Sequence, residues 1–123
     1  MTYNRGVMIL ANWQLTERIL AKYQPLSETA FYILLSLMVQ SSHGYGISKY
    51  VAELTDERIV LGSGTIYGTL NKMLKDGLVT VYADGERKKV YEITELGSSV
   101  FYREKARIKE VYDHSLTIGG DLS

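Results

Sequence analysis

The stretch from Ser63 to Val79 constrains the fold more than any other part of this 123-residue chain. Ser63 is suited to be an N-cap, because its hydroxyl can accept hydrogen bonds from the free backbone N–H groups of a first helical turn. Gly77 lies where a left-handed residue can end the helix, and Leu78 can then fold back onto Met73 in a Schellman motif. The spacing predicts an amphipathic helix whose apolar stripe consists of Ile66, Leu70, Met73 and Leu74.

The opposite face of this helix carries hydrogen-bonding side chains and one cation, namely Thr65, Tyr67, Thr69, Asn71 and Lys72. Such groups can reach the phosphates and base edges of DNA. An ordinary amphipathic helix presents a similar polar face to solvent. The stretch alone therefore leaves two interpretations open, a DNA recognition helix and a solvated surface helix.

After Gly77 the hydrophobic period changes from helical to alternating, which indicates β-strands. Asp84-Gly85 is a strong turn signal, and a second strand is expected over about residues 89–93. A hairpin directly after a recognition helix is the wing of a winged-helix protein. Its tip contains three consecutive cations, Arg87, Lys88 and Lys89, which suit contacts to flanking DNA but also occur in solvated loops.

Two further helices are expected upstream. Ser27 can cap the first, which is apolar on most sides and should be the most buried helix. The second is expected from about Gly46 to Leu54, and a short connection then leads into the Ser63 helix. This order satisfies the helix-turn-helix pattern, in which one helix braces across the DNA backbone while the next enters the major groove.

Further elements are expected before and after this helix-turn-helix and its wing. Residues 1–12 allow a strand or an arm, and a helix is expected from Asn12 until Gln24-Pro25 ends it, packed either in cis or on a partner subunit. Thr94 can cap a last helix that reaches about His114. Its apolar stripe has no later partner in the chain, so we expect a dimer interface there.

The expected fold class is mainly α with a small β-hairpin (α+β), a winged helix-turn-helix with an N-terminal extension helix and a C-terminal dimerisation helix. The expected division is an N-terminal extension over 1–25, a winged helix-turn-helix domain over 26–94, a dimerisation helix over 95–116 and a disordered tail over 117–123.

Composition narrows the function classes. Cysteine is absent, which excludes disulfides, thiolate metal sites and cysteine nucleophiles. His43 fits a structural residue at a helix start and His114 a charge near a helix C-terminus, and no phosphate-loop or paired-carboxylate motif is present. We therefore expect no enzyme, no metal and no other cofactor. The longest apolar-rich run, Ala30–Val39, is too short to span a bilayer, so we expect a cytoplasmic protein without a membrane partner.

In its helices, turn and wing, the sequence resembles the PadR family of transcriptional regulators over residues 26 to about 114. The departures are few: Ile66 replaces a commoner leucine, Val90 replaces a common aromatic residue, and the N-terminal extension is longer than usual. The resemblance rests on Leu26-Ser27, His43-Gly44-Tyr45-Gly46-Ile47, Ser63-Gly64-Thr65-Ile66-Tyr67, Lys75-Asp76-Gly77-Leu78-Val79 and the segment 86–97.

This resemblance implies a homodimeric winged-helix repressor that responds to a small aromatic or phenolic effector. We expect the dimer to bind double-stranded DNA and to read a pseudo-palindrome whose half-sites lie about 34 Å apart. The expected DNA contacts are Ser63, Thr65, Tyr67, Thr69, Lys72, Arg87, Lys88 and Lys89. The expected effector contacts near the dimer axis are Trp13, Phe101 and Tyr102, for which core or interface packing is the alternative.

The net charge counts against nucleic-acid binding, because Lys plus Arg and Asp plus Glu both number 14. A local basic patch can nevertheless bind DNA on a neutral protein. The zero net charge favours one alternative function, a winged-helix module that makes protein contacts and has no specific DNA site.

Overall fold

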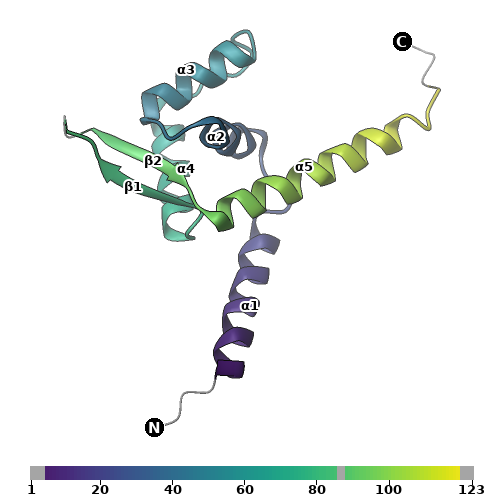
Figure 1. Cartoon of the computed structure of the whole chain (residues 1–123). Helices are drawn as coiled ribbons and strands as arrows, with labels where there is room; N and C mark the ends of the chain where they lie inside the picture. Colours follow the sequence, from purple (N-terminus) through teal and green to yellow (C-terminus); the bar gives the residue numbers. More distant parts are fainter. Residues whose placement is uncertain (1–4, 86–87, 120–123) are drawn as a thin grey trace.

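The computed structural model describes residues 5–85 and 88–119, with side chains from residue 13 onward. Helices α2, α3 and α4 and the hairpin form a compact centre, from which α1 and α5 extend in different directions (Figure 1). This confirms the predicted fold class. Within the described part the elements are α1 (Arg5–Lys22), α2 (Glu28–Val39), α3 (Gly44–Leu54), α4 (Ser63–Lys75), β1 (Val79–Ala83), β2 (Lys89–Ile93) and α5 (Glu95–Ser115).

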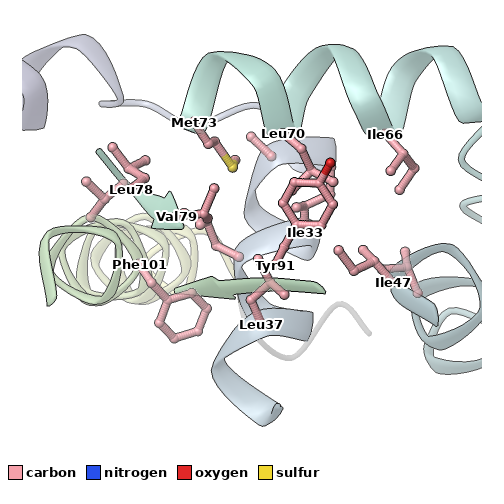
Figure 2. Close-up of a cluster of buried hydrophobic side chains, with 14 of the residues drawn as sticks. Ile33, Leu37, Ile47, Ile66, Leu70, Met73, Leu78, Val79, Tyr91 and Phe101 are labelled. Atoms are coloured by element: carbon pink, nitrogen blue, oxygen red, sulfur yellow. The ribbon is translucent and has the colours of Figure 1, made fainter. Parts of the chain in front are cut away.

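Helix α2 is the centre of the packing. Its N-cap is Ser27, whose hydroxyl accepts a hydrogen bond from the Ala30 N–H at 3.1 Å, as the sequence predicted. The helix contacts α3, β2 and α5. Three elements therefore pack against this apolar helix. Figure 2 shows its Ile33 and Leu37 in a shared core with Ile47, Ile66, Leu70, Met73, Leu78, Val79, Tyr91 and Phe101.

The end of α4 has the predicted Schellman geometry. Gly77 has φ +79°, the left-handed conformation that favours glycine. The Leu78 N–H donates to the Met73 carbonyl oxygen at 2.8 Å, and the Gly77 N–H donates to that of Leu74 at 3.2 Å. The chain thereby turns directly into β1, which fixes where the hairpin starts relative to α4.

The hairpin is antiparallel, with Val79 opposite Ile93 and Ala83 opposite Lys89. A third segment joins it, because Ser42 and Tyr91 exchange backbone hydrogen bonds of 3.0 and 2.9 Å. Ser42 lies just before α3, so the wing is fastened to the start of the helix-turn-helix as well as to the end of α4.

Three expectations at the element ends need correction. Helix α1 begins at Arg5, so the strand or arm expected within residues 1–12 is wrong; residues 7–23 contain no glycine or proline that would interrupt a helix. Helix α3 begins at Gly44, two residues earlier than expected. In the expected tail, residues 117–119 form a turn after α5, and residues 120–123 lie outside the described residues.

Candidate nucleic-acid interface

The N-terminus of α4 is open. The extended residue before the helix is Gly62, with φ −73° and ψ 160°, so Gly62 is the N-cap and the capping role predicted for Ser63 is wrong. Ser63 is already helical, and its hydroxyl is one residue too far along to accept from the first turn. Among the described residues no side chain caps these N–H groups. An uncapped helix start attracts an anion such as a phosphate.

The predicted polar face of α4 is largely exposed. Ile66, Leu70 and Met73 are buried and hold the helix in the core. The side chains that face solvent are those of Ser63, Thr65, Tyr67 and Lys72, all four of which were expected to contact DNA.

Thr69 is the exception on this face. It is only partly exposed and lines a cavity of about 220 Å³ beneath the α1–α2 connection, with Tyr23, Pro25 and Lys72 among the other lining residues. Thr69 therefore lies on the flank that faces α1 rather than on the outermost surface of α4.

A different strip of α4 is outermost. Helical spacing places Gly64, Gly68, Asn71 and Lys75 opposite the buried stripe, and all four are exposed. The sequence reasoning placed Asn71 on the polar face without assigning it a DNA contact, and it did not assign Gly64, Gly68 or Lys75 to the interface. A helical projection centred on Ile66, Leu70 and Met73 would have identified them, because the face most distant from the core enters a groove first.

Tyr67 extends this surface toward α3. A Cβ atom at Gly44 would lie 2.7 Å from the Tyr67 hydroxyl oxygen, so the tyrosine packs directly against the backbone at the start of α3. Tyr67 also lies near Tyr91: burial first, and the neighbouring Tyr67 second, raise the pKa of the Tyr91 phenol. Tyr67 thus connects α4, α3 and the sheet.

Two adjacent grooves bring together four of the predicted DNA contacts, Ser63, Tyr67, Lys88 and Lys89, whereas Thr65, Thr69 and Lys72 line neither groove. One, of about 540 Å³, lies between the start of α3 and the wing and is lined by His43, Tyr45, Gly46, Tyr67, Lys88 and Lys89. The other, of about 330 Å³, lies between α3 and α4 and includes Ser63, Tyr67 and Tyr45 in its lining. Tyr45 and Tyr67 are common to both, so the helix start and the wing lysines share one continuous surface. Arg87 lies outside the described residues.

Tyr45 is a second residue that the sequence reasoning missed. It is highly exposed and lies at the boundary between the two grooves. The position of Tyr45 at the start of α3 could have identified it from the sequence, because this end of the first helix of a helix-turn-helix approaches the DNA backbone.

His43 joins the wing to the start of α3. Its Nδ1 atom lies 3.0 Å from the Lys89 carbonyl oxygen, and its Nε2 atom lies 3.3 Å from Asp84 Oδ2. The structure thus supports the structural role predicted for His43, although its partners are in the wing rather than in α3.

The other end of α4 is fastened to α1. The Asp76 carboxylate accepts hydrogen bonds from Lys22 Nζ at 2.7 Å and from the Tyr23 hydroxyl at 2.5 Å. These two donors hold the pKa of Asp76 below its usual range. Burial and the hydrogen bond to Asp76 raise the pKa of Tyr23. The orientation of α4 is therefore linked to the last turn of α1.

The three residues expected to contact an effector are only partly brought together. Phe101 is buried and stacks on Phe31 of α2 with ring centroids 5.1 Å apart. Tyr102 meets Phe101 edge-on at 5.5 Å but is 55% exposed. Trp13 lies on α1 and is 61% exposed. Phe101 therefore belongs to the core, whereas the other two rings face outward.

An ion pair places Trp13 and Tyr102 near the same junction of α1 and α5. Arg103, the neighbour of Tyr102, lies 3.8 Å from Glu17, which follows Trp13 by one helical turn. Arg103 also donates to the Gln24 side-chain oxygen at 3.3 Å. Trp13 and Tyr102 thus each lie within about one helical turn of a residue of this ion pair along their own helix.

The family assignment agrees with this arrangement. The model of the transcriptional regulator PadR-like family matches residues 33–103, more than half of the chain. The chain belongs to the PadR-like family. The matched region runs from α2 through the first part of α5, so it contains both grooves and the whole wing.

Two solved transcriptional regulators have a similar fold, and one further protein is similar in sequence. A transcriptional regulator from Clostridium thermocellum is 25% identical, with a TM-score of 0.66 over 73% of this chain and 91% of that one. A PadR family regulator from Clostridium difficile R20291 is 26% identical, with a TM-score of 0.61 over 73% of this chain and 99% of that one. An uncharacterised protein of Lysinibacillus sphaericus is 28% identical over 88 residues, which are 66% of this chain and 81% of the relative.

PadR-like proteins are transcriptional regulators that bind DNA and are not enzymes, which confirms two of the expectations from sequence. In the described part of the chain, no three or more acidic or histidine side chains are grouped so that they could hold a metal ion. None of the helices described is both long enough and apolar enough to cross a lipid bilayer.

Proposed function

We propose that this protein is a homodimeric, sequence-specific repressor that reads a pseudo-palindromic operator. One observation carries the proposal: the open N-terminus of α4 and the wing lysines line adjoining grooves that meet at Tyr45 and Tyr67. A surface that combines a helix start, hydroxyl groups and two cations suits the phosphate backbone on either side of a major groove.

The residues divide into two kinds of contact. We assign Lys72, Lys88 and Lys89 to phosphates, because a lysine ammonium is a mobile point charge without base preference. Ser63, Thr65 and Tyr67 are assigned to phosphate or base contacts near the helix start. Asn71, which the sequence placed on the polar face without a specific contact, is assigned to a base edge, because it lies on the outermost strip of α4.

The dimer is proposed to form through α5. The C-terminal part of this helix extends away from the centre of the molecule (Figure 1). Its apolar residues Ile108, Val111 and Tyr112 are exposed at helical spacing. A second copy of the chain would bury this stripe on its own equivalent face, as a two-fold interface requires. The same interface would set the spacing of the two α4 helices.

We further propose that an aromatic effector binds between Trp13 and Tyr102. Both rings are exposed next to the α1–α5 ion pair, and α1 is also fastened to α4 through Asp76. An effector that moved α1 relative to α5 could therefore change the position of the recognition helix. Binding of a phenolic compound would quench Trp13 fluorescence, and Tyr102→Ala would weaken that quenching; equal quenching in the variant would contradict the site.

The DNA-binding role is tested by the salt dependence of affinity for the promoter of the protein's own gene, measured by fluorescence anisotropy. For Lys88→Ala/Lys89→Ala, the slope of log K against log salt should fall by about two units for each bound subunit. The matched control is Lys105→Ala/Lys109→Ala on α5, which should keep the wild-type slope. An unchanged slope in the wing variant would remove the wing from the interface.

A scrambled duplex separates the repressor from a protein-interaction module. A repressor binds the promoter far more tightly than the scrambled duplex, by a factor of about 10³ or more. Equal, weak affinity for the two duplexes would favour the interaction module, which the zero net charge of the chain also favours.

A further inference from the structure

We propose that His43 is a proton-dependent latch that fixes the wing against the start of α3, so that DNA binding by this face is coupled to proton uptake. The coupling rests on the proposed DNA-binding function. The contact between protonated His43 and the wing does not depend on that function, because it forms within the protein in the absence of DNA.

Each of the two ring nitrogens of His43 lies close to one oxygen atom of the wing. Nδ1 lies 3.0 Å from the Lys89 carbonyl oxygen, and Nε2 lies 3.3 Å from Asp84 Oδ2. Both partners are acceptors, and a neutral imidazole has a single N–H to donate. Only the protonated ring can donate to both at once. Histidine is also the residue type that ordinarily changes charge between about pH 5 and 8.

The two acceptors lie on the two sides of the wing hairpin. Asp84 directly follows β1, and Lys89 is the first residue of β2. They also flank the turn, because the Asp84 N–H donates to the Lys88 carbonyl oxygen at 2.9 Å and the Lys88 N–H donates to Asp84 Oδ1 at 3.0 Å. A protonated His43 therefore fastens both strands, and with them Lys88 and Lys89, to the start of α3.

The surroundings of His43 couple the latch to DNA. Asp84 from the wing faces the ring and favours its positive charge, whereas Lys88 and Lys89 oppose it. Tyr45 from α3 and Tyr67 from α4 line the same groove. DNA phosphates bound to the two lysines would offset their repulsion, so that DNA binding favours protonation. By reciprocity, protonation then strengthens DNA binding.

The first measurement is the affinity for operator DNA between pH 6 and 8 at constant ionic strength. For the wild type, affinity should fall about three- to tenfold per subunit as pH rises, because the proton is lost from the latch. His43→Gln and Asp84→Asn should each flatten this dependence to within about twofold, the latter while keeping the size of the side chain. His114→Gln is the control, because His114 is exposed near the end of α5, and should keep the wild-type slope.

The second measurement needs no DNA. In the free protein, the backbone amide signals of Lys88, Lys89 and Val90 should titrate in NMR spectra with the same midpoint as the His43 ring. These titrations should disappear in His43→Gln and persist in His114→Gln.

The two measurements separate the latch from the proposed function. Wing amides that do not titrate, or a wild-type pH slope that persists in His43→Gln, would overturn the latch. A titrating wing in a protein that binds no DNA at any pH would support the latch and refute the proposed function.

Discussion

Glu104 on α5 and Leu26 before α2 are joined by a hydrogen bond across 78 positions of sequence. The Leu26 N–H donates to Glu104 Oε2 at 2.5 Å, and the carboxylate is only 2% exposed. Arg107 donates to both carboxylate oxygens, at 2.6 and 3.0 Å. The Arg107 guanidinium, and secondarily the Leu26 N–H, hold the pKa of Glu104 below its usual range despite burial. This carboxylate fastens α5 to the α1–α2 connection.

We predict that Glu104→Gln lowers the free energy of unfolding by about 1–3 kcal/mol at pH 7, because the charge-assisted hydrogen bonds of a buried group are weakened. A carboxyl whose folded pKa is depressed stabilises the protein above its unfolded pKa of about 4.3 and loses that contribution as pH falls through the folded value. The difference in urea stability between wild type and variant should therefore shrink below about pH 4.3. Glu110→Gln, an exposed change on the same helix, is the control; a pH-independent difference would contradict the prediction.

Replacement of Gly97 by a residue with a Cβ atom should have a large steric effect on stability. It lies in the first turn of α5, where a Cβ atom would collide with the Leu78 carbonyl oxygen and approach Ile93 Cγ1 to 2.7 Å. Since backbone cannot yield as a flexible side chain does, Gly97→Ala should destabilise the fold by about 1–3 kcal/mol in thermal or urea unfolding.

The matched control for this substitution is Gly68→Ala in α4, where a Cβ atom would meet nothing within 4 Å. It should raise stability by up to about 1 kcal/mol, because alanine has the higher helix propensity. Equal effects of the two substitutions would show that helix propensity, and not the contact with Leu78, determines the result.

Glu57 stores backbone strain between α3 and α4. It has φ +62°, and its N–H donates to the Ala52 carbonyl oxygen at 2.7 Å after Asp56, which has φ +49°. A left-handed conformation costs a residue other than glycine about 1 kcal/mol. Glu57→Gly should therefore raise the unfolding free energy by up to about this amount. Glu57→Gln controls for the lost charge and should leave stability nearly unchanged; a similar gain in both would point to charge instead of strain.

Asn71 should determine one base of the operator. An asparagine amide can pair with the N6 and N7 positions of adenine, which is worth about 1–3 kcal/mol against the wrong base. Selection of bound fragments from a random library should therefore lose an adenine preference at one position per half-site in Asn71→Ala. Lys75→Ala, on the same strip, should weaken binding to all sequences about equally. An unchanged preference in Asn71→Ala would exclude base reading by this residue.

Val111 should control assembly. It is 53% exposed and lies in the last two turns of α5. A charge there would have to be buried in the proposed interface, so Val111→Glu should sediment as a 13.9 kDa monomer while the wild type sediments as a dimer. Glu110→Gln should remain dimeric. A monomeric wild type, or a dimeric Val111→Glu, would contradict the proposed use of α5.

The features that the sequence predicted correctly depend on interactions between residues that are close together in the chain. The hydroxyls of Ser27 and Thr94 accept from N–H groups three residues ahead, in Ala30 and Gly97, and such caps are readable from sequence. Periodicity found the buried stripe of α4, and glycine chemistry found its end at Gly77. The exposed positions of Ser63, Tyr67, Lys88 and Lys89 agree with the predicted interface, while their contacts to DNA stay predictions.

The features that the sequence did not predict are of two kinds, the exact ends of helices and the contacts between residues that are far apart in the chain. A one-residue change of cap, from Ser63 to Gly62, lies below the precision of any capping pattern. The sequence by itself determined the order of the helices, the turn, the wing and the family, but not where α1 and α3 begin. Only the tertiary structure decided that Glu104 is buried, that His43 meets Lys89 across 46 positions, and that Tyr45 and Tyr67 join two grooves. These contacts depend on how whole elements pack against one another, and no local pattern of residues records that packing.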